Sequence, residues 1–193
     1  IQSFSNIIWD NPAQTANLNM GWNGVTITGN ITINSTGTGR WYFAGPTTGS
    51  TAEFTINGNV IHNGGNFAVH GTGNGNTTII IHHFGNVTAN AGNFSICRGS
   101  QAGTGTTTWY LHGNLILNNT ETQNSNATGA RFVFAGEEFR TLVLNNVTYG
   151  GGGLPLAVDS NAVVNLGNNV IGGNGTFTIA DFGGVITSHP DGL

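Results

Sequence analysis

Gly58-Asn59-Val60-Ile61-His62-Asn63 is the stretch that decides the fold, because its pattern of a Gly-Asn or Asn-Asn pair before a short apolar run recurs along the chain. Counted at the Asn before the apolar run, the spacings are 29, 27, 28, 32 and 23 residues. A unit of about 28 residues, present six times, indicates a repeat architecture. The six marker residues are Asn30, Asn59, Asn86, Asn114, Asn146 and Asn169.

Two further segments of alternating apolar and polar residues accompany each marker, one upstream and one downstream. The upstream segments are 25–27, 54–56, 79–81, 109–111, 142–144 and 163–166. The downstream segments are 41–43, 67–69, 94–96, 132–134, 156–158 and 177–179. Strict alternation over three to five residues predicts short strands with one buried face, and the Gly, Asn and Thr between them favour turns. Each unit therefore holds three strands, and no segment has an apolar period typical of a helix.

Three short strands per unit fit a barrel, a sandwich or a parallel solenoid. Only a solenoid stacks equivalent strands directly and so selects the same residue type at the same place in every coil. We therefore expect an all-β, right-handed parallel β-helix of about six or seven coils, with three strands per ~28-residue coil. The markers should form one asparagine ladder, each side-chain amide bonding to the next. A second ladder should comprise Asn34, Asn63, Asn90 and Asn118.

Residues 1–193 are expected to form a single β-helix domain. Residues 1–20 are the most divergent part and are predicted to form an N-terminal cap or the first coil. The repeated coils should occupy 21–187, and 188–193 should form a tail. The chain begins at Ile1 without a leader, which favours an excised fragment.

Composition excludes several classes of function. The chain has 32 Gly, 28 Asn and 26 Thr among 193 residues, which argues against a helical or α/β domain. Only 6% of the residues are charged, and the four basic residues are all Arg, so no basic cluster is available for nucleic acid. No apolar run approaches the length needed for a membrane-spanning helix. The lone Cys97 excludes an internal disulfide and a Cys-based zinc site.

The chain resembles the β-helical stretches of very large secreted surface proteins of bacteria of the Bacteroidetes type. The resemblance is carried by the Gly-Asn-apolar repeat, by 39–45 and 130–136 with their Arg-aromatic-x-Phe-Ala-Gly pattern, and by Ser188-His189-Pro190-Asp191-Gly192. It implies an extracellular, adhesin-like passenger or stalk region. The leading hypothesis is therefore a structural or adhesive segment of an extracellular bacterial protein. Its expected partners are an extracellular polysaccharide or another surface protein, and the stack should also associate end to end.

The alternative hypothesis is a carbohydrate-active enzyme, a polysaccharide lyase or hydrolase of the same fold. Hydrolases of this fold need clustered Asp pairs, and the lyases need a calcium-binding carboxylate cluster beside Arg or Lys. The chain has no adjacent Asp residues and no Lys. We therefore expect no catalytic residue, no cofactor and no metal site.

Carboxylates are the first candidate ligand contacts. Alignment of the downstream segments places Asp159 and Asp181 one coil apart, with Glu137 and Glu138 in the coil before. Carboxylates that lie close together can bind a cation or act as an acid/base pair. Solvated residues at coil corners are the simpler interpretation.

Aromatic residues are the second candidates. Tyr42 and Tyr110 lie between inward-facing neighbours, so their rings should be exposed as platforms for a sugar face. The upstream column reads Thr26, Thr55, His82 and Tyr110, which breaks the regular Thr array that ice binding would require.

The remaining histidines and the cysteine have structural interpretations. His70 and Cys97 should lie in one outward-facing column on adjacent coils, and no third residue completes a catalytic set with them. His62 occupies a position filled elsewhere by apolar residues, so it should be buried and hydrogen-bonded. Because His82 and His83 are adjacent on a strand, they should face opposite ways.

Overall fold

The computed structural model describes residues 2–44, 50–71, 77–97, 106–124, 130–151, 153–166, 177–181 and 183–187. Every regular element within these ranges is a β-strand, and all the strand pairs are parallel. The all-β, parallel solenoid expected from the repeat is therefore confirmed. No helix in the described ranges could cross a membrane. The sixth marker, Asn169, and the predicted tail at 188–193 lie outside these ranges.

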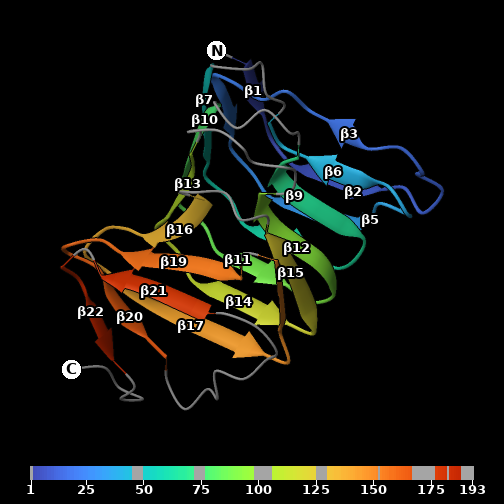
Figure 1. Cartoon of the computed structure of the whole chain (residues 1–193). Helices are drawn as coiled ribbons and strands as arrows, with labels where there is room; N and C mark the ends of the chain where they lie inside the picture. The colour runs from blue at the N-terminus through green and yellow to red at the C-terminus, as the bar shows by residue number, and fades with distance from the viewer. Residues whose placement is uncertain are drawn as a thin grey trace.

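Three sheets run along the stack, one for each strand of the coil (Figure 1). Sheet A contains β1 (Gln2–Phe4), β4 (Val25–Ile27), β7 (Thr51–Ile56), β10 (Thr78–His83), β13 (Thr107–Leu111), β16 (Ala130–Phe134), β19 (Leu154–Val158) and β21 (Phe177–Asp181). Sheet B contains β2 (Ile7–Asp10), β5 (Ile31–Ser35), β8 (Val60–His62), β11 (Val87–Ala89), β14 (Leu115–Asn118), β17 (Phe139–Asn145), β20 (Val163–Asn165) and β22 (Val185–Thr187). Sheet C contains β3 (Leu18–Asn19), β6 (Arg40–Tyr42), β9 (Asn66–His70), β12 (Gly92–Cys97), β15 (Thr120–Asn124) and β18 (Thr148–Gly151).

The sheets have eight, eight and six strands in the described ranges, so the coil count differs slightly from the expected six or seven. The first coil is made by β1, β2 and β3, each paired with the equivalent strand of the second coil. Residues 2–19 thus supply a complete coil.

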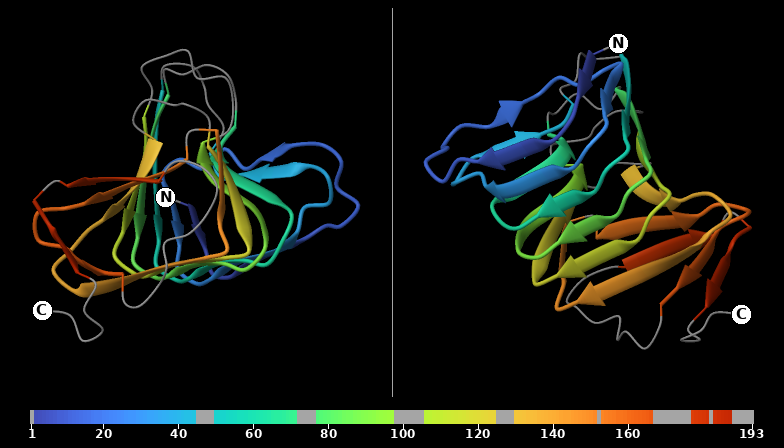
Figure 2. Two further views of the ribbon diagram at one scale, coloured as in Figure 1. Left: turned by 60° about the horizontal axis from the view of Figure 1, so that its bottom comes forward. Right: turned by 180° about the vertical axis from the view of Figure 1, so that it is seen from behind.

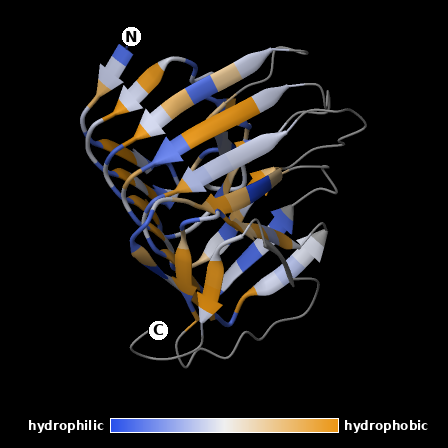
Figure 3. Ribbon diagram, turned by 90° about the vertical axis from the view of Figure 1, so that its left-hand side faces the viewer, coloured by the Kyte–Doolittle hydropathy of each residue, from blue (hydrophilic) through white to orange (hydrophobic). Residues whose placement is uncertain are grey.

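Alternation along each strand builds the core. In sheet B, one inward column contains Ile31, Val60, Val87, Leu115 and Leu142, and all of these side chains are buried. Figure 3 shows that hydrophobic and hydrophilic residues are interspersed along the strands of sheet A. Stacked rings add an aromatic column that crosses coils: Trp9 and Trp41 lie 5.6 Å apart, and Phe67 and Phe94 lie 5.1 Å apart. Each coil therefore buries its apolar face against its neighbours rather than alone.

Both asparagine ladders exist, and they differ in the atoms that they join. The second ladder runs from the second coil to the fifth, and the marker ladder runs from the first coil to the sixth. In the second ladder, Asn63 Nδ2 donates to Asn34 Oδ1 at 2.9 Å and Asn90 Nδ2 donates to Asn63 Oδ1 at 3.0 Å, as expected. In the marker ladder, the side-chain oxygen instead accepts from the next marker's backbone N–H. Asn59 Oδ1, for example, accepts from the Asn86 N–H at 2.9 Å. The marker ladder satisfies turn amides that no strand partner reaches.

The marker ladder starts earlier and ends earlier than the repeat predicts. Asn6 Oδ1 accepts from Asn30 N at its first step, and Asn114 Oδ1 accepts from Thr141 N at its last. Asn146, the fifth marker, does not belong to it. Asn146 instead donates from Nδ2 to Asn119 Oδ1 at 2.9 Å, and both residues have positive φ.

The predicted strand assignment is wrong after Asn118. Segment 142–144 lies in sheet B, where Leu142 pairs with Leu115, and not in sheet A. Segments 132–134, 156–158 and 177–179 lie in sheet A and not in sheet C. The true sheet C strands of these coils are β15 and β18, whose sequences TETQN and TYGG lack apolar alternation. The neighbouring aromatic strands carry the stronger hydrophobic signal and were therefore assigned to the wrong sheet.

A lateral step interrupts the stack at β17. Residues 142–145 of this strand pair with β14, whereas 139–141 pair with β20. This shift of three residues offsets the following strands of sheet B by about 10 Å along the strand direction. Figure 2 shows the resulting sideways displacement of the orange and red coils from the blue and green coils.

Candidate functional site

A polar groove lies at the corner where sheet B leads into sheet C. It encloses about 540 Å³ and crosses four consecutive coils. Its lining contains amide, hydroxyl and glycine residues and a single charged group. These residues, called the amide groove below, are Gly65, Asn66, Gly92, Asn93, Asn119, Thr120, Glu121, Gln123, Asn146 and Thr148.

The turn chemistry opens the groove. Gly65 and Gly92 have φ values of +80° and +78°, and a Cβ on Gly92 would lie 2.4 Å from the Gly65 carbonyl oxygen. Only glycine fits these two stacked positions, so the backbone there stays bare. In the next two coils the left-handed residue moves one place earlier, to Asn119 and Asn146, whose side chains are bonded to each other. The groove therefore has bare backbone in two coils and amide side chains in the other two.

Strand register aligns the polar side chains along the groove. Asn66, Asn93, Glu121 and Thr148 occupy one column of sheet C, each paired with the next. Asn93 is buried and accepts from Ser95 Oγ at 2.9 Å. Gln123 donates from Nε2 to Glu121 Oε1, and its backbone N–H donates to Ser95 Oγ. This network fixes the side chains that face the groove.

A second polar surface lies on the outer face of sheet A. The expected column of Thr26, Thr55, His82 and Tyr110 is confirmed by the register. His82 Nε2 lies 3.2 Å from Glu53 Oε1, and its ring stacks on Tyr110 with centroids 5.4 Å apart. A small pocket of about 190 Å³ beside this column is lined by Tyr110, Arg131, Val133 and Asp159.

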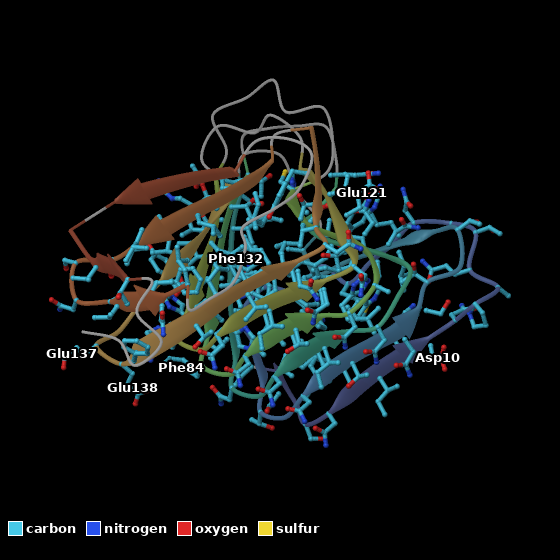
Figure 4. The ribbon with its side chains drawn as sticks, turned by 90° about the horizontal axis from the view of Figure 1, so that it is seen from below. Asp10, Phe84, Glu121, Phe132, Glu137 and Glu138 are labelled. Atoms are coloured by element: carbon cyan, nitrogen blue, oxygen red, sulfur yellow. The ribbon has the colours of Figure 1, made fainter. Side chains whose placement is uncertain are left out.

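A third cluster lies at the corner between sheets A and B. The Phe84 ring is 55% exposed and stacks on His112 with centroids 4.6 Å apart. Beneath it, the buried Arg140 donates to Glu138 Oε2 at 3.2 Å. Burial, then Arg140 and His82, lower the pKa of His112, while Asp159 acts in the opposite direction. Figure 4 shows Phe84, Glu137 and Glu138 on one side of the molecule and Glu121 of the amide groove on the other.

The carboxylates named in the sequence analysis lie at or just after the ends of sheet A strands. Val158 pairs with Phe134 and with Asp181, so Asp159 and Asp181 are offset by one position in the register of sheet A. Asp159 is exposed, and its Oδ1 accepts from the Ser160 N–H at 2.8 Å, which stabilises the turn. Glu137 and Glu138 are exposed in the turn after β16. Within the described part of the chain, no three His, Cys, Asp or Glu residues are placed to hold a metal ion.

Of the two tyrosines, only Tyr110 is partly exposed. Tyr42 is 4% exposed, contrary to the expectation of an open ring. Its ring covers Gly71, where an added Cβ would lie 1.9 Å from the Tyr42 Cζ. The glycine therefore provides the space into which the ring folds, a relationship that strand alternation alone does not predict.

The remaining residues largely match the sequence analysis. His70 and Cys97 pair in adjacent coils, as expected, with Nδ1 and Sγ 3.5 Å apart, and both side chains are buried. His82 and His83 face opposite sides of their strand, as predicted. His62 is buried as predicted, but neither ring nitrogen makes a hydrogen bond of good geometry. Burial lowers its pKa to about 4, with a partial opposing effect from the backbone of Ala91 and Gly64.

The amide groove was missed by sequence reasoning because its lining comes from four coils that are distant in sequence. One signal was present. Gly64-Gly65-Asn66-Phe67 and Ala91-Gly92-Asn93-Phe94 share Gly-Asn-Phe at equivalent places in their coils, which marks a stacked glycine beside a stacked amide.

Comparison of the chain with protein-family models, with curated proteins and with solved structures finds no match.

Proposed function

We propose that the chain is a structural and adhesive segment of an extracellular bacterial surface protein. In this role the coil stack holds a binding surface at a fixed distance and direction. The observation that carries the proposal is the pair of asparagine ladders, which connects successive coils on both sides of sheet B.

Rigidity follows from the way the coils are connected. Each inner strand is hydrogen-bonded to a strand above and a strand below, so no coil can leave without breaking both sets of bonds. The marker ladder adds bonds at the turns, where solenoids otherwise depend on water. Aromatic ring contacts from Trp9 through Trp41 and Phe67 to Phe94 extend the same continuity through the core.

Chemical durability also supports an extracellular role. The single thiol, Cys97, is buried at 1% exposure, which protects it from oxidation. Most of the described backbone is tied into sheets, which leaves few extended segments for a protease to bind. The expected partners are an extracellular polysaccharide or another surface protein, contacted along one long face.

Single-molecule stretching of the chain between two handles tests the proposal. We expect the stack to resist force and then to unfold coil by coil, because each coil is held by its own ladder bonds. The variant Asn59→Ala removes one acceptor from the marker ladder and should lower the force at which the stack first opens. Extension at low force without resolved steps, like that of a disordered linker, would contradict a rigid spacer.

A further inference from the structure

We propose that the amide groove binds a neutral polysaccharide, one rich in hydroxyl groups and free of carboxylates. This inference rests on the proposed adhesive function and deepens it, because it names the surface and the class of polymer.

The lining is chemically suited to sugar hydroxyls. Asn and Gln side chains each present a donor and an acceptor, so one amide can bond two neighbouring hydroxyls of a sugar ring. Asn66, Gln123 and Asn146 supply such amides, and Thr148 adds a hydroxyl. Bare backbone at Gly65 and Gly92 lets a bulky ring approach closely. The enclosed volume of about 540 Å³ lies within the range of small-molecule sites.

Charge sets the preference for a neutral polymer. Glu121 is the single charged residue among those lining the groove. Its carboxylate accepts hydrogen bonds from hydroxyls and repels the carboxylates of an acidic polysaccharide. Among the described residues that line the groove, none is an arginine that could offset that repulsion. The groove therefore differs from the pocket on sheet A, where Arg131 and Asp159 both contribute.

The coil repeat suits a polymer rather than a single sugar. The column of Asn66, Asn93, Glu121 and Thr148 crosses four coils at ~4.8 Å per coil, a span of about 14 Å. Asn93 is buried, and the other three residues present polar groups along that span. A chain of sugars lying along the stack axis therefore meets polar contacts in three of the four coils. Because none of the described lining residues is aromatic, they offer no ring to stack against a sugar face, and we expect binding at this one site to be weak.

Affinity gel electrophoresis tests the assignment with polymers of known charge. Native gels would contain dextran, xylan or galactomannan as neutral polymers, and polygalacturonate as the acidic polymer. We expect the chain to be retarded by at least one neutral polymer and not by polygalacturonate. If none of the neutral polymers retards the chain, the proposal is overturned. It is also overturned if polygalacturonate is the one polymer that retards it.

Two groove variants and one control locate the binding. Gln123→Ala removes an amide whose backbone bond remains, and it should weaken binding about 3- to 10-fold. Thr148→Arg places a long side chain at an exposed groove position and should abolish binding. Glu53→Gln changes an exposed carboxylate on sheet A and should leave retardation unchanged. If both groove variants bind like the unmodified chain, the groove is not the site.

The stretching experiment separates this inference from the proposed function. A chain that unfolds in steps at high force but binds no neutral polymer would retain its role as a spacer and lose only the groove assignment.

Discussion

Trp109 Nε1 donates a hydrogen bond to His83 Nδ1 at 3.3 Å inside the coil stack. On the other side of the ring, His83 Nε2 lies 2.7 Å from the Gly58 carbonyl oxygen. These partners fix a neutral imidazole with its proton on Nε2, because Nδ1 must accept. Protonation would place the Nδ1–H of His83 against the Nε1–H of Trp109. Burial, with an additional contribution from His112, lowers the pKa of His83 to about 4 despite the opposing effect of the hydrogen bond with the Gly58 backbone. His62, in the neighbouring column of the core, has a pKa lowered to about 4 by the same burial.

The first prediction is a loss of stability in mild acid. Both histidines have an ordinary pKa of 6.5 in the unfolded chain and about 4 in the fold, so the unfolded state binds more protons between these values. The free energy of unfolding should therefore be greatest above pH 6.5 and should fall as the pH falls toward 4. Each histidine contributes about 3 kcal/mol to this loss. Urea denaturation at pH 7 and pH 4.5 measures it, and equal midpoints would contradict the burial of neutral rings.

The second prediction separates the two histidines. His62→Leu places an apolar side chain in a column with Ile33 and Leu117, and it removes two buried nitrogens that lack good hydrogen bonds. We expect it to raise the free energy of unfolding at pH 7 by about 1 kcal/mol and to weaken the acid dependence.

His83→Leu is the matched control for that variant. It leaves the Trp109 N–H and the Gly58 carbonyl without their partner, so it should destabilise the fold by about 1 to 3 kcal/mol at pH 7. Similar effects of the two variants at pH 7 would show that the hydrogen bonds of His83 contribute nothing.

The third prediction compares the two asparagine ladders. Asn59→Ala removes the acceptor for the Asn86 N–H at a partly buried turn, so it should cost about 1 to 2 kcal/mol. Asn63→Ala breaks exposed amide-to-amide bonds, where water replaces the lost partner, and should cost less than about 0.5 kcal/mol. Thermal denaturation of both variants shows which one loses more stability. A larger loss of stability for Asn63→Ala than for Asn59→Ala would refute this account.

Periodicity predicted most of the fold but not the strand assignment after Asn118. The repeat works where inward residues are apolar, as in Phe67 and Phe94 of sheet C. It fails at β15, where the inward residues Thr120 and Thr122 are buried hydroxyl residues that look like loop sequence. Side-chain conformation was equally hidden from the pattern. Alternation predicts the face of the sheet on which the Tyr42 side chain lies, but it does not predict that the ring folds over Gly71.

The fourth prediction concerns this contact between Tyr42 and Gly71. Gly71→Ala places a methyl group inside the space of the Tyr42 ring, so the ring must move out. We expect a loss of about 1 to 3 kcal/mol in the free energy of unfolding. The double variant Tyr42→Ser with Gly71→Ala should lose less than the sum of the two single changes. Additive losses would mean that the two residues do not compete for the same space.

The fifth prediction is concentration-dependent association. Sheets A and B begin at β1 and β2 and end at β21 and β22, which leaves strand edges at both ends of the described stack. Exposed apolar residues lie there, including Ile8 at 70% and Val185 at 39%. Sedimentation should show larger species as concentration rises. Ile8→Lys and Val185→Lys add charge at opposite ends and should restore the monomer. A monomer at every concentration would contradict open edges.

The marker ladder also gives the molecule a direction of assembly. Each turn N–H donates to a side chain of the preceding coil, from Asn30 onto Asn6 down to Thr141 onto Asn114. A newly made coil therefore finds its acceptor already in place on the coil synthesised before it. For these ladder bonds, folding from the N-terminus during translation does not wait for sequence that has not yet been made. Strand amides such as those of Ile31 and Val60, in contrast, donate to the Asn59 and Asn86 carbonyl oxygens of the following coil. The ribosome therefore makes the donor N–H groups in the same order in which the ladder bonds can form.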